Sequence, residues 1–224
     1  MFKRTEILLR EDFEKVKNAN VIVFGCGGVG GYVVEMLARM GISKLTLVDF
    51  DTISTSNLNR QIIAMQDNVG KFKVQEFKKR ILKINSNAEV IAITDKLLPE
   101  NLKYFNLESY DYIADCIDMV SSKVALMQYA YENNLPLISA MGTGNRTGIP
   151  NFVVTDIFDT EYDGLSKVLR RELRKRNVKK SKVVFCKEQA ISTNSKEIGS
   201  VVYYPAMCGC VMSAFIIQEL TNKK

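Results

Sequence analysis

Short apolar runs alternate with amphipathic helical stretches through the first two thirds of the chain. Residues 21–24 form an apolar run that ends at Gly25, and Val33, Leu37 and Met40 recur on one side of a predicted helix over 29–40. The pattern predicts further strands at 45–48, 89–93, 112–114 and 137–140, helices over about 71–84 and 120–133, and a polar loop at 51–68. This alternation indicates an α/β, Rossmann-like, doubly wound fold with a mostly parallel sheet.

The pattern changes after residue 144. It predicts a strand at 151–156, a basic helix at 165–176, a strand at 183–185 and an apolar helix at 206–220. Because no linker composition interrupts the chain, we expect one domain over 1–224, with a nucleotide-binding core at 1–144 and a substrate-facing C-terminal extension with a closing helix at 145–224. The last helix falls short of the roughly 20 apolar residues of a membrane span, so we expect no span and favour a core or dimer-interface helix over a membrane anchor.

The amino-acid composition excludes several classes of catalytic site. Hydrophobic residues make up 46% of the 224 residues, which is enough for a folded core, and the chain contains no histidine. The absence of histidine excludes Ser-His-Asp triads, Cys-His proteases and HExxH zinc peptidases within this chain. The five cysteines include no C-x-x-C pair, so we expect free thiols and no structural zinc. The N-terminal residues lack the apolar core of a signal peptide, and the expected compartment is cytoplasmic.

Positive charge is concentrated in one segment. Between residues 167 and 182 the chain has nine basic residues and one acidic residue, a net +8 against +6 for the whole chain. A surplus confined to one segment is typical of a surface that contacts a polyanion, and a solvated helix end is the alternative. The residues that would bind such a partner are Lys167, Arg170, Arg171, Arg174, Lys175, Arg176, Lys179 and Lys180.

A glycine-rich turn joins the first predicted strand to the first predicted helix. The sequence G-C-G-G-V-G at 25–30 supplies Gly25, Gly27, Gly28 and Gly30. In this context the glycines permit a tight turn and bring the backbone and a helix N-terminus close to a phosphate. Asp49 ends the second strand, where a carboxylate reaches ribose hydroxyls. The motif predicts a nucleotide site, the alternative being a glycine turn that only packs against its own sheet.

Further polar motifs favour ATP over NAD. Asp51 completes D-F-D at 49–51, Asn57 and Arg60 lie in S-N-L-N-R-Q at 56–61, Lys73 lies in G-K-F-K, and Asp118 ends D-C-I-D. Phosphate transfer needs cations for the charge on the leaving pyrophosphate and a carboxylate for Mg²⁺, whereas a dinucleotide dehydrogenase needs neither. We therefore predict ATP and Mg²⁺ as cofactors, and Arg60, Lys73 and Asp118 as catalytic residues. Roles for Lys71 and Asp115 stay open.

Together these motifs resemble the ThiF/MoeB/E1-like superfamily, which adenylates carboxylates. The later segments resemble its tRNA threonylcarbamoyladenosine dehydratase branch (TcdA-like). That likeness rests on R-T-x-x-L-L at the N-terminus, M-G-T-G-N-R at 141–146, R-R-E-L-R-K-R at 170–176, and K-V-V with K-E at 182–188. The resemblance implies that ATP and Mg²⁺ activate the threonylcarbamoyl carboxylate of a tRNA adenosine as an acyl-adenylate. The ureido oxygen of the same group would then close a ring with net loss of water, and its tethering replaces an enzyme nucleophile.

The resemblance also implies roles position by position. Asp49 would hold the ribose, Asn57, Arg60 and Lys73 the triphosphate, and Asp118 the Mg²⁺. Arg4 would reach the nucleotide of the partner subunit in a homodimer. The family pattern further allows a cysteine desulfurase or sulfur-acceptor partner.

Departures from the family pattern leave alternatives. The chain has Thr147-Gly148-Ile149-Pro150 where the branch has an Asp-Pro. We favour core thiols over two alternatives, because no His can activate a thiol. One alternative is a thioester nucleophile at Cys186, and the other is a redox pair at Cys208-Gly209-Cys210. Two other functions compete: activation of the C-terminus of a ubiquitin-like sulfur-carrier protein, and a non-catalytic nucleotide-binding module.

Overall fold

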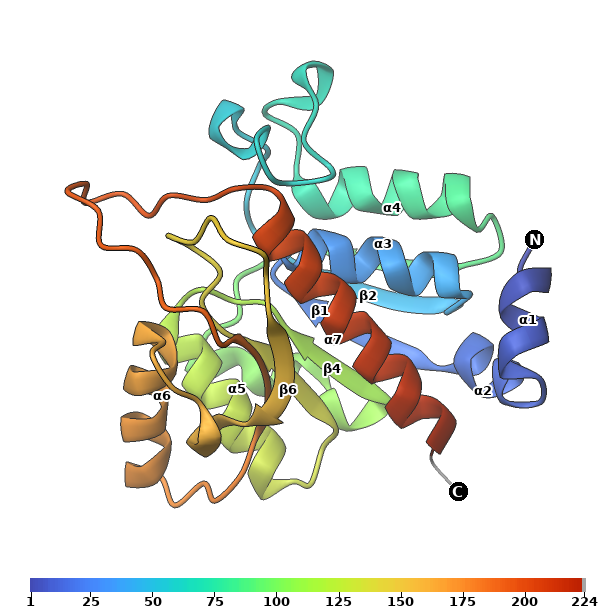
Figure 1. Cartoon of the computed structure of the whole chain (residues 1–224). Coiled ribbons are helices and arrows are strands. Elements are labelled where there is room, and N and C mark those ends of the chain that lie inside the picture. The colour runs from blue at the N-terminus through green and yellow to red at the C-terminus, as the bar shows by residue number, and fades with distance from the viewer. Residues whose placement is uncertain (223–224) are drawn as a thin grey trace.

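The structure, a computed structural model, describes residues 1–222 and is built on a seven-stranded sheet (Figure 1). The strands are β1 (Asn20–Phe24), β2 (Lys44–Val48), β3 (Glu89–Ile93), β4 (Tyr112–Asp115), β5 (Leu137–Ala140), β6 (Phe152–Asp156) and β7 (Lys182–Cys186). Their order is β3-β2-β1-β4-β5-β7-β6, and every neighbouring pair is parallel except β6 and β7. The prediction of a doubly wound, mostly parallel sheet is confirmed.

Helices cover both faces of the sheet. On one face lie α3 (Gly30–Met40), α4 (Lys73–Ile84) and α7 (Tyr203–Asn222), and on the other lie α5 (Val120–Glu132), α6 (Gly164–Lys175) and the 3₁₀ segment η3 (Pro99–Phe105). Figure 1 shows α7 crossing in front of the central strands. Because both faces are covered, the central strands are nearly continuous hydrophobic runs, as the sequence pattern indicated.

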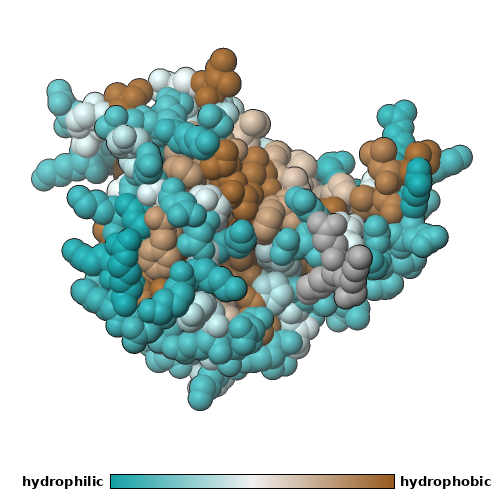
Figure 2. Space-filling view, turned by 60° about the horizontal axis from the view of Figure 1, so that its bottom comes forward, coloured by the Kyte–Doolittle hydropathy of each residue, from teal (hydrophilic) through white to brown (hydrophobic). Residues whose placement is uncertain are grey.

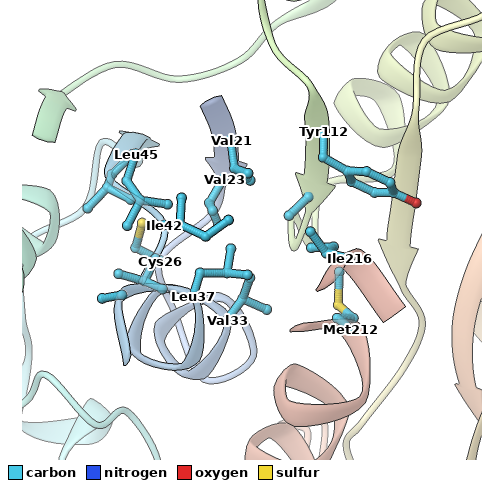
Figure 3. Close-up of a cluster of buried hydrophobic side chains, with 14 of the residues drawn as sticks. Val21, Val23, Cys26, Val33, Leu37, Ile42, Leu45, Tyr112, Met212 and Ile216 are labelled. Atoms are coloured by element: carbon cyan, nitrogen blue, oxygen red, sulfur yellow. The ribbon is translucent and has the colours of Figure 1, made fainter. Parts of the chain in front are cut away.

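The core on the α3 and α7 face is formed by aliphatic side chains. Val33 and Leu37 of α3 point toward Val23 of β1, and Met212 and Ile216 of α7 lie beside β4 (Figure 3). All five side chains are fully buried. Because the period of these apolar positions matches one side of each helix, burial of this core fixes both helices against the sheet.

Several elements differ from the predictions. Two seven-residue helices, α1 (Lys3–Leu9) and α2 (Asp12–Asn18), precede the sheet and were not predicted, because such short helices show too few turns for a periodic pattern. α7 begins three residues before the predicted position 206. The predicted polar loop contains two 3₁₀ turns, η1 (Thr55–Asn57) and η2 (Gln66–Asn68), and two more such turns lie at Leu107–Ser109 and Ile157–Asp159.

The topology defines where a ligand can enter. β2 and β3 lie on one side of β1, whereas β4 and β5 lie on its other side, so the chain changes direction between β1 and β4. A crevice forms at the carboxyl ends of the strands at such a point, and ligands bind there in open α/β sheets. Within the described residues, no helix combines the length and the apolar character needed to cross a bilayer.

Candidate nucleotide site

A cavity of about 760 Å³ opens at the carboxyl ends of the central strands. Of the residues predicted to bind ATP, those that line it are Gly25, Gly27, Gly28, Asp49, Asp51, Asn57, Arg60, Lys73 and Asp118. They come from five separate segments of the chain, and only the parallel arrangement of the strands brings those segments to one edge. The structure therefore gathers nearly the whole predicted set in one place.

The turn between β1 and α3 requires glycine. Gly25 has a φ of +82°, and a Cβ atom there would lie 2.7 Å from the carbonyl oxygen of Cys116. At Gly30 a Cβ would lie 1.8 Å from the carbonyl oxygen of Gly25, and Gly30 does not line the cavity. Gly30 is thus required for the tight turn. The turn places the N-terminus of the eleven-residue helix α3 at the cavity, and a helix N-terminus favours a bound phosphate.

The Asp49 side chain is fixed by backbone amides. Its Oδ2 accepts a hydrogen bond from Cys26 N at 2.6 Å, and its Oδ1 accepts one from Asp51 N at 2.8 Å. Burial raises the pKa of Asp49, and Lys73 and the two amides only partly oppose this effect. Each carboxylate oxygen keeps a further lone pair that can accept a hydroxyl, as a ribose-binding carboxylate must.

Two cations at the cavity are held by partners from this chain. Lys73 Nζ lies 2.7 Å from Asp51 Oδ2, and the lysine side chain is 5% exposed. Arg60 Nη1 donates to Ser56 O at 2.8 Å and to the Asn59 side chain at 2.9 Å. These contacts hold both positive charges at the edge of the cavity.

Asn57 stabilises the turn from which Arg60 extends. Its Oδ1 accepts a hydrogen bond from Ser54 N at 3.0 Å, and Arg60 N donates to Asn57 O at 3.1 Å. The Asn57 side chain therefore shapes the loop between β2 and α4 as well as lining the cavity.

The segment after β4 contributes one exposed and one buried carboxylate. Asp118 is exposed at the cavity, and within residues 1–222 its carboxylate makes no hydrogen bond or ion pair. Asp115 is fully buried and lies 2.7 Å from Lys123 Nζ. Asp115 thus forms an internal ion pair, which settles the role that the sequence left open. The two aspartates of D-C-I-D therefore differ in exposure and in partners.

The basic segment lies on α6 and in the turn before β7. Lys167, Arg170, Arg171, Arg174 and Lys175 lie on α6, and Arg176, Lys179 and Lys180 follow it. Part of this charge is occupied internally. Glu172 forms ion pairs with Arg171, Lys175 and Arg176. Arg170 donates a hydrogen bond to the carbonyl oxygen of Thr160 at 2.7 Å, and Arg174 lies over the Phe158 ring. The other three lysines, Lys167, Lys179 and Lys180, are exposed, and within residues 1–222 their side-chain nitrogens have no such partner.

Other predicted residues lie away from the cavity. Arg4 is exposed on α1 and does not line the cavity of its own chain. Cys208 is buried, as a core thiol should be, whereas Cys210 is partly exposed. Cys186 is buried at the end of β7. Burial raises the pKa of Cys26, Cys116 and Cys208, which disfavours their thiolate forms.

Sequence reasoning missed several residues. Gln61 lines the cavity, and its buried Oε1 has no hydrogen-bond partner within residues 1–222. Lys96 also lines the cavity and lies over the Phe50 ring, 4.8 Å from its centre. Lys123 has a signal in the sequence, because it occupies the apolar stripe of α5 three residues after Val120 and four before Met127. Gly142, Thr143 and Gly144 were noted as a motif without a role, and they line the cavity.

A doubly wound sheet with a glycine turn, a carboxylate at the end of its second strand and two cations in its crevice is typical of a nucleotide-binding α/β protein. The sequence pattern of the ThiF family matches residues 4–224. The chain therefore belongs to the ThiF family.

Comparison with known proteins adds detail. A Bacillus subtilis protein named tRNA threonylcarbamoyladenosine dehydratase is 35% identical over 238 residues, covering 98% of this chain and 94% of that one. The crystal structure of the Escherichia coli tRNA N6-threonylcarbamoyladenosine dehydratase TcdA in complex with ATP superimposes with a TM-score of 0.93 at 31% identity, covering 99% of this chain and 94% of that one. A Xenopus laevis adenylyltransferase and sulfurtransferase, MOCS3, is 36% identical but covers 56% of this chain and 28% of its own length.

Proposed function

We propose that this protein is an ATP-dependent tRNA threonylcarbamoyladenosine dehydratase. It adenylates the threonylcarbamoyl carboxylate of the modified tRNA adenosine and then closes the cyclic form with loss of water. The observation that carries the proposal is the cavity: the glycine turn, Asp49, Arg60, Lys73 and Asp118 line one crevice, in a chain that matches an ATP complex of such an enzyme over nearly its whole length. Activation of a carrier protein is the weaker candidate, because that likeness covers about half of the chain.

The order of the strands supports a proposed position for each part of ATP. Asp49 follows β2 and would accept the ribose hydroxyls. The glycine turn follows β1 and would bind phosphate through backbone amides. Arg60 and Lys73 would exchange their present partners for the β- and γ-phosphates, which offer a full negative charge in place of a carbonyl group or a shared carboxylate.

The residues present fit a magnesium ion. Mg²⁺ commonly binds one or two carboxylates together with phosphate oxygens and several waters, so a protein need not supply a full set of ligands. Asp118 is a carboxylate of this kind, exposed at the cavity. When bound there, the ion would neutralise charge on the departing pyrophosphate. The described residues hold no group of three or more Cys, His, Asp or Glu arranged for a metal, so the phosphates would have to complete the site.

The chemistry then requires little from side chains. The substrate carboxylate attacks the α-phosphorus, the bond to pyrophosphate breaks, and Arg60 and Lys73 stabilise the charge that develops on the leaving group. The ureido oxygen of the same substrate next attacks the activated carbonyl carbon, AMP leaves, and the ureido nitrogen loses a proton. The attacking atom is tethered to its target, so no Cys or His is needed.

The basic segment would contact tRNA. Lys167, Lys179 and Lys180 are exposed, and no ion pair or hydrogen bond occupies their side-chain nitrogens within residues 1–222. Leu165, at the start of α6, lines the cavity, so α6 connects the basic segment to the reaction site. Phosphate contacts from such lysines would position the anticodon loop over the cavity.

A homodimer would explain the exposed apolar residues. Ile7 and Leu8 of α1 and Val202, Tyr203 and Met207 around the start of α7 are exposed. Figure 2 shows apolar residues gathered across the middle of one face, with hydrophilic residues around them. Exposed apolar residues gathered on one face are typical of a protein interface. In such a dimer α1 of one subunit would carry Arg4 toward the nucleotide of the other.

The direct test is a nucleoside assay. Purified protein is incubated with ATP, Mg²⁺ and tRNA that bears threonylcarbamoyladenosine, and the digested nucleosides are analysed by mass spectrometry. We expect a nucleoside lighter by one water, with AMP as co-product. Absence of this product, together with ATP-dependent adenylation of a Gly-Gly-tailed carrier protein, would transfer the assignment to the weaker candidate. Arg39→Gln, on the far end of α3, serves as a control variant.

A further inference from the structure

One buried guanidinium organises the loop that follows β5. Arg146 is 3% exposed. Its Nη1 donates to Gly142 O at 2.9 Å and to Gly144 O at 3.2 Å, and its Nε donates to Glu188 O at 2.7 Å. Its Nη2 lies 3.4 Å from Asp163 Oδ2. In a trans peptide group the C=O of one residue and the N–H of the next point in opposite directions. By holding Gly142 O, Arg146 therefore turns the Thr143 N–H away from itself, and by holding Gly144 O it does the same for the Asn145 N–H.

The amide groups of the same loop are unpaired. Within residues 1–222, the backbone N–H groups of Gly142, Thr143 and Gly144 donate no hydrogen bond. The two residues that flank the loop are tied down, Met141 N to Val184 O and Asn145 N to Gly199 O, both within 2.9 Å. All three loop residues are half-buried and line the cavity. Half-buried amides in a fixed loop require an acceptor, and here the cavity is where one can bind.

Packing behind the loop keeps it in place. A Cβ atom at Gly142 would lie 2.6 Å from Asp163 Oδ2, and a Cβ at Gly144 would lie 2.2 Å from Ile198 Cγ2. Asp163 is buried, so Gly142 has no room for a side chain and the backbone itself forms the wall there, whereas Ile198 is exposed and lines the cavity itself. The chemistry that the wall offers is that of N–H donors.

The position in the sheet indicates which part of the substrate meets these donors. Four of the segments that line the cavity follow β2, β1, β4 and β5, which are consecutive neighbours in the sheet. Asp49 follows β2, the glycine turn follows β1, and Asp118 follows β4. Gly142 to Gly144 follow β5, so they lie beyond the phosphate positions on the side away from the ribose. A group joined to the α-phosphate and extending away from the ribose would reach them.

We propose that the loop of Gly142, Thr143 and Gly144 binds the carboxylate oxygen of the substrate through the backbone amide of Thr143, and that Arg146 is the positioning residue that orients this amide by holding Gly142 O. The inference rests on the proposed function and adds the part of the site that recognises the acyl group. In the first step the amide aligns the carboxylate whose other oxygen attacks the α-phosphorus. In the second step it stabilises the negative charge on the carbonyl oxygen while the ureido oxygen bonds to carbon, until the electron pair on that oxygen re-forms the C=O bond and the bond to AMP breaks.

The test separates the acyl group from the nucleotide. The probe is 5′-O-sulfamoyladenosine acylated with N-carbamoylthreonine, a stable mimic of the acyl-adenylate, and AMP is the reference ligand. For Arg146→Gln and Arg146→Lys we expect AMP affinity within about twofold of wild type and probe affinity at least tenfold weaker. The single-turnover rate of dehydration should fall about 100-fold, the loss typical of a disturbed oxyanion site. Arg39→Gln removes a half-exposed, ion-paired arginine elsewhere and should match wild type in all three measurements.

A spectrum of the wild-type protein keeps the inference testable if the variants do not fold. In protein labelled with ¹⁵N-threonine, the amide ¹H and ¹⁵N resonances of Thr143 should shift when the probe is added and stay in place when AMP is added. Unmoved resonances would overturn the inference, as would folded Arg146 variants with wild-type probe affinity and rate. If the probe shifts these resonances but the wild-type protein makes no dehydrated nucleoside, the proposed function is wrong, whereas the acyl-binding role of the loop is retained.

Discussion

Lys123 Nζ lies 2.7 Å from Asp115 Oδ2, and neither side chain has any exposed surface. Lys123 also donates to the carbonyl oxygen of Asp115 at 3.4 Å, while Asp115 Oδ1 accepts from Ile117 N at 3.1 Å. The pair therefore links the start of α5 to the end of β4. Between them runs the short segment that carries Asp118 to the cavity, so a buried ion pair sets the position of the exposed carboxylate.

Removing one member of the Lys123–Asp115 ion pair should destabilise the folded protein. In Lys123→Met the Asp115 carboxylate stays buried without a counter-charge, and we expect the free energy of unfolding to fall by about 3–5 kcal/mol. Urea denaturation followed by circular dichroism measures the change. The double variant Lys123→Met with Asp115→Leu removes both charges and should recover most of the loss. A single variant within 1 kcal/mol of wild type, on the scale of an exposed ion pair, would contradict the assigned burial cost.

Asp118 should matter for chemistry and hardly for stability. Its carboxylate is exposed and makes no contact that holds the fold together within the described residues. We expect Asp118→Ala to keep the wild-type melting temperature and to lose adenylation, measured as ATP-pyrophosphate exchange in the presence of substrate tRNA. Asp95→Ala, which removes another carboxylate at the cavity rim, serves as the comparison. Full exchange activity in Asp118→Ala would remove it from the magnesium site.

The exposed lysines near α6 should carry more of the tRNA affinity than the paired arginines. Lys179→Ala with Lys180→Ala removes two charges that have no protein partner within residues 1–222, and we expect the log-log slope of tRNA affinity against salt to flatten by about 0.7–0.9 per lost phosphate contact. ATP affinity should be unchanged. The matched control, Lys44→Ala with Lys83→Ala, removes two exposed lysines from β2 and α4. Equal slopes for both double variants would mean that the segment is only a solvated helix end.

Glu35 should make stability depend on acid pH. Burial alone would raise the pKa of Glu35, but hydrogen bonds from Arg80 and Arg39, with N–O distances of 2.7–2.8 Å, outweigh it and lower the pKa below its usual value of 4.5. The folded state therefore binds this proton less readily than the unfolded state, and the stabilisation is present above pH 4.5 and is lost as the pH falls below it. Glu35→Gln should cost about 1–3 kcal/mol at pH 7. A gap between variant and wild type that stays constant from pH 7 to pH 3 would contradict this.

Adenosine binding should weaken in acid because of Asp49. Burial raises the pKa of this carboxyl above its usual 3.8, so protonation begins at a higher pH than for a free aspartate. A protonated carboxyl loses acceptor capacity for ribose hydroxyls. Calorimetry with adenosine between pH 7 and pH 4 should show affinity falling with pH in wild type. Asp49→Asn should show only the dependence that comes from the ligand itself, and parallel curves for the two proteins would contradict a ribose role for Asp49.

The sequence alone determined the strands, most helices, and the glycine and polar motifs that line the cavity at the ends of β1, β2 and β4. Those features depend on local periodicity and on residues at the ends of strands, and in a parallel sheet the ends of neighbouring strands necessarily meet at one edge. Thus Asp49, Lys73 and Asp118 could be grouped from their positions relative to predicted strands, although they are separated by up to 69 positions in the sequence.

Tertiary structure decided what each polar residue contacts. Asp115 and Asp118 lie in one tetrapeptide, yet only packing of α5 against β4 buries the first and leaves the second at the cavity. Likewise, Arg146 belongs to a recognisable motif, but its role depends on carbonyl groups that point inward and on residues far along the chain. Hydrogen-bond geometry and burial arise from three-dimensional packing, and no periodic pattern in a single sequence encodes which partner a buried charge will find.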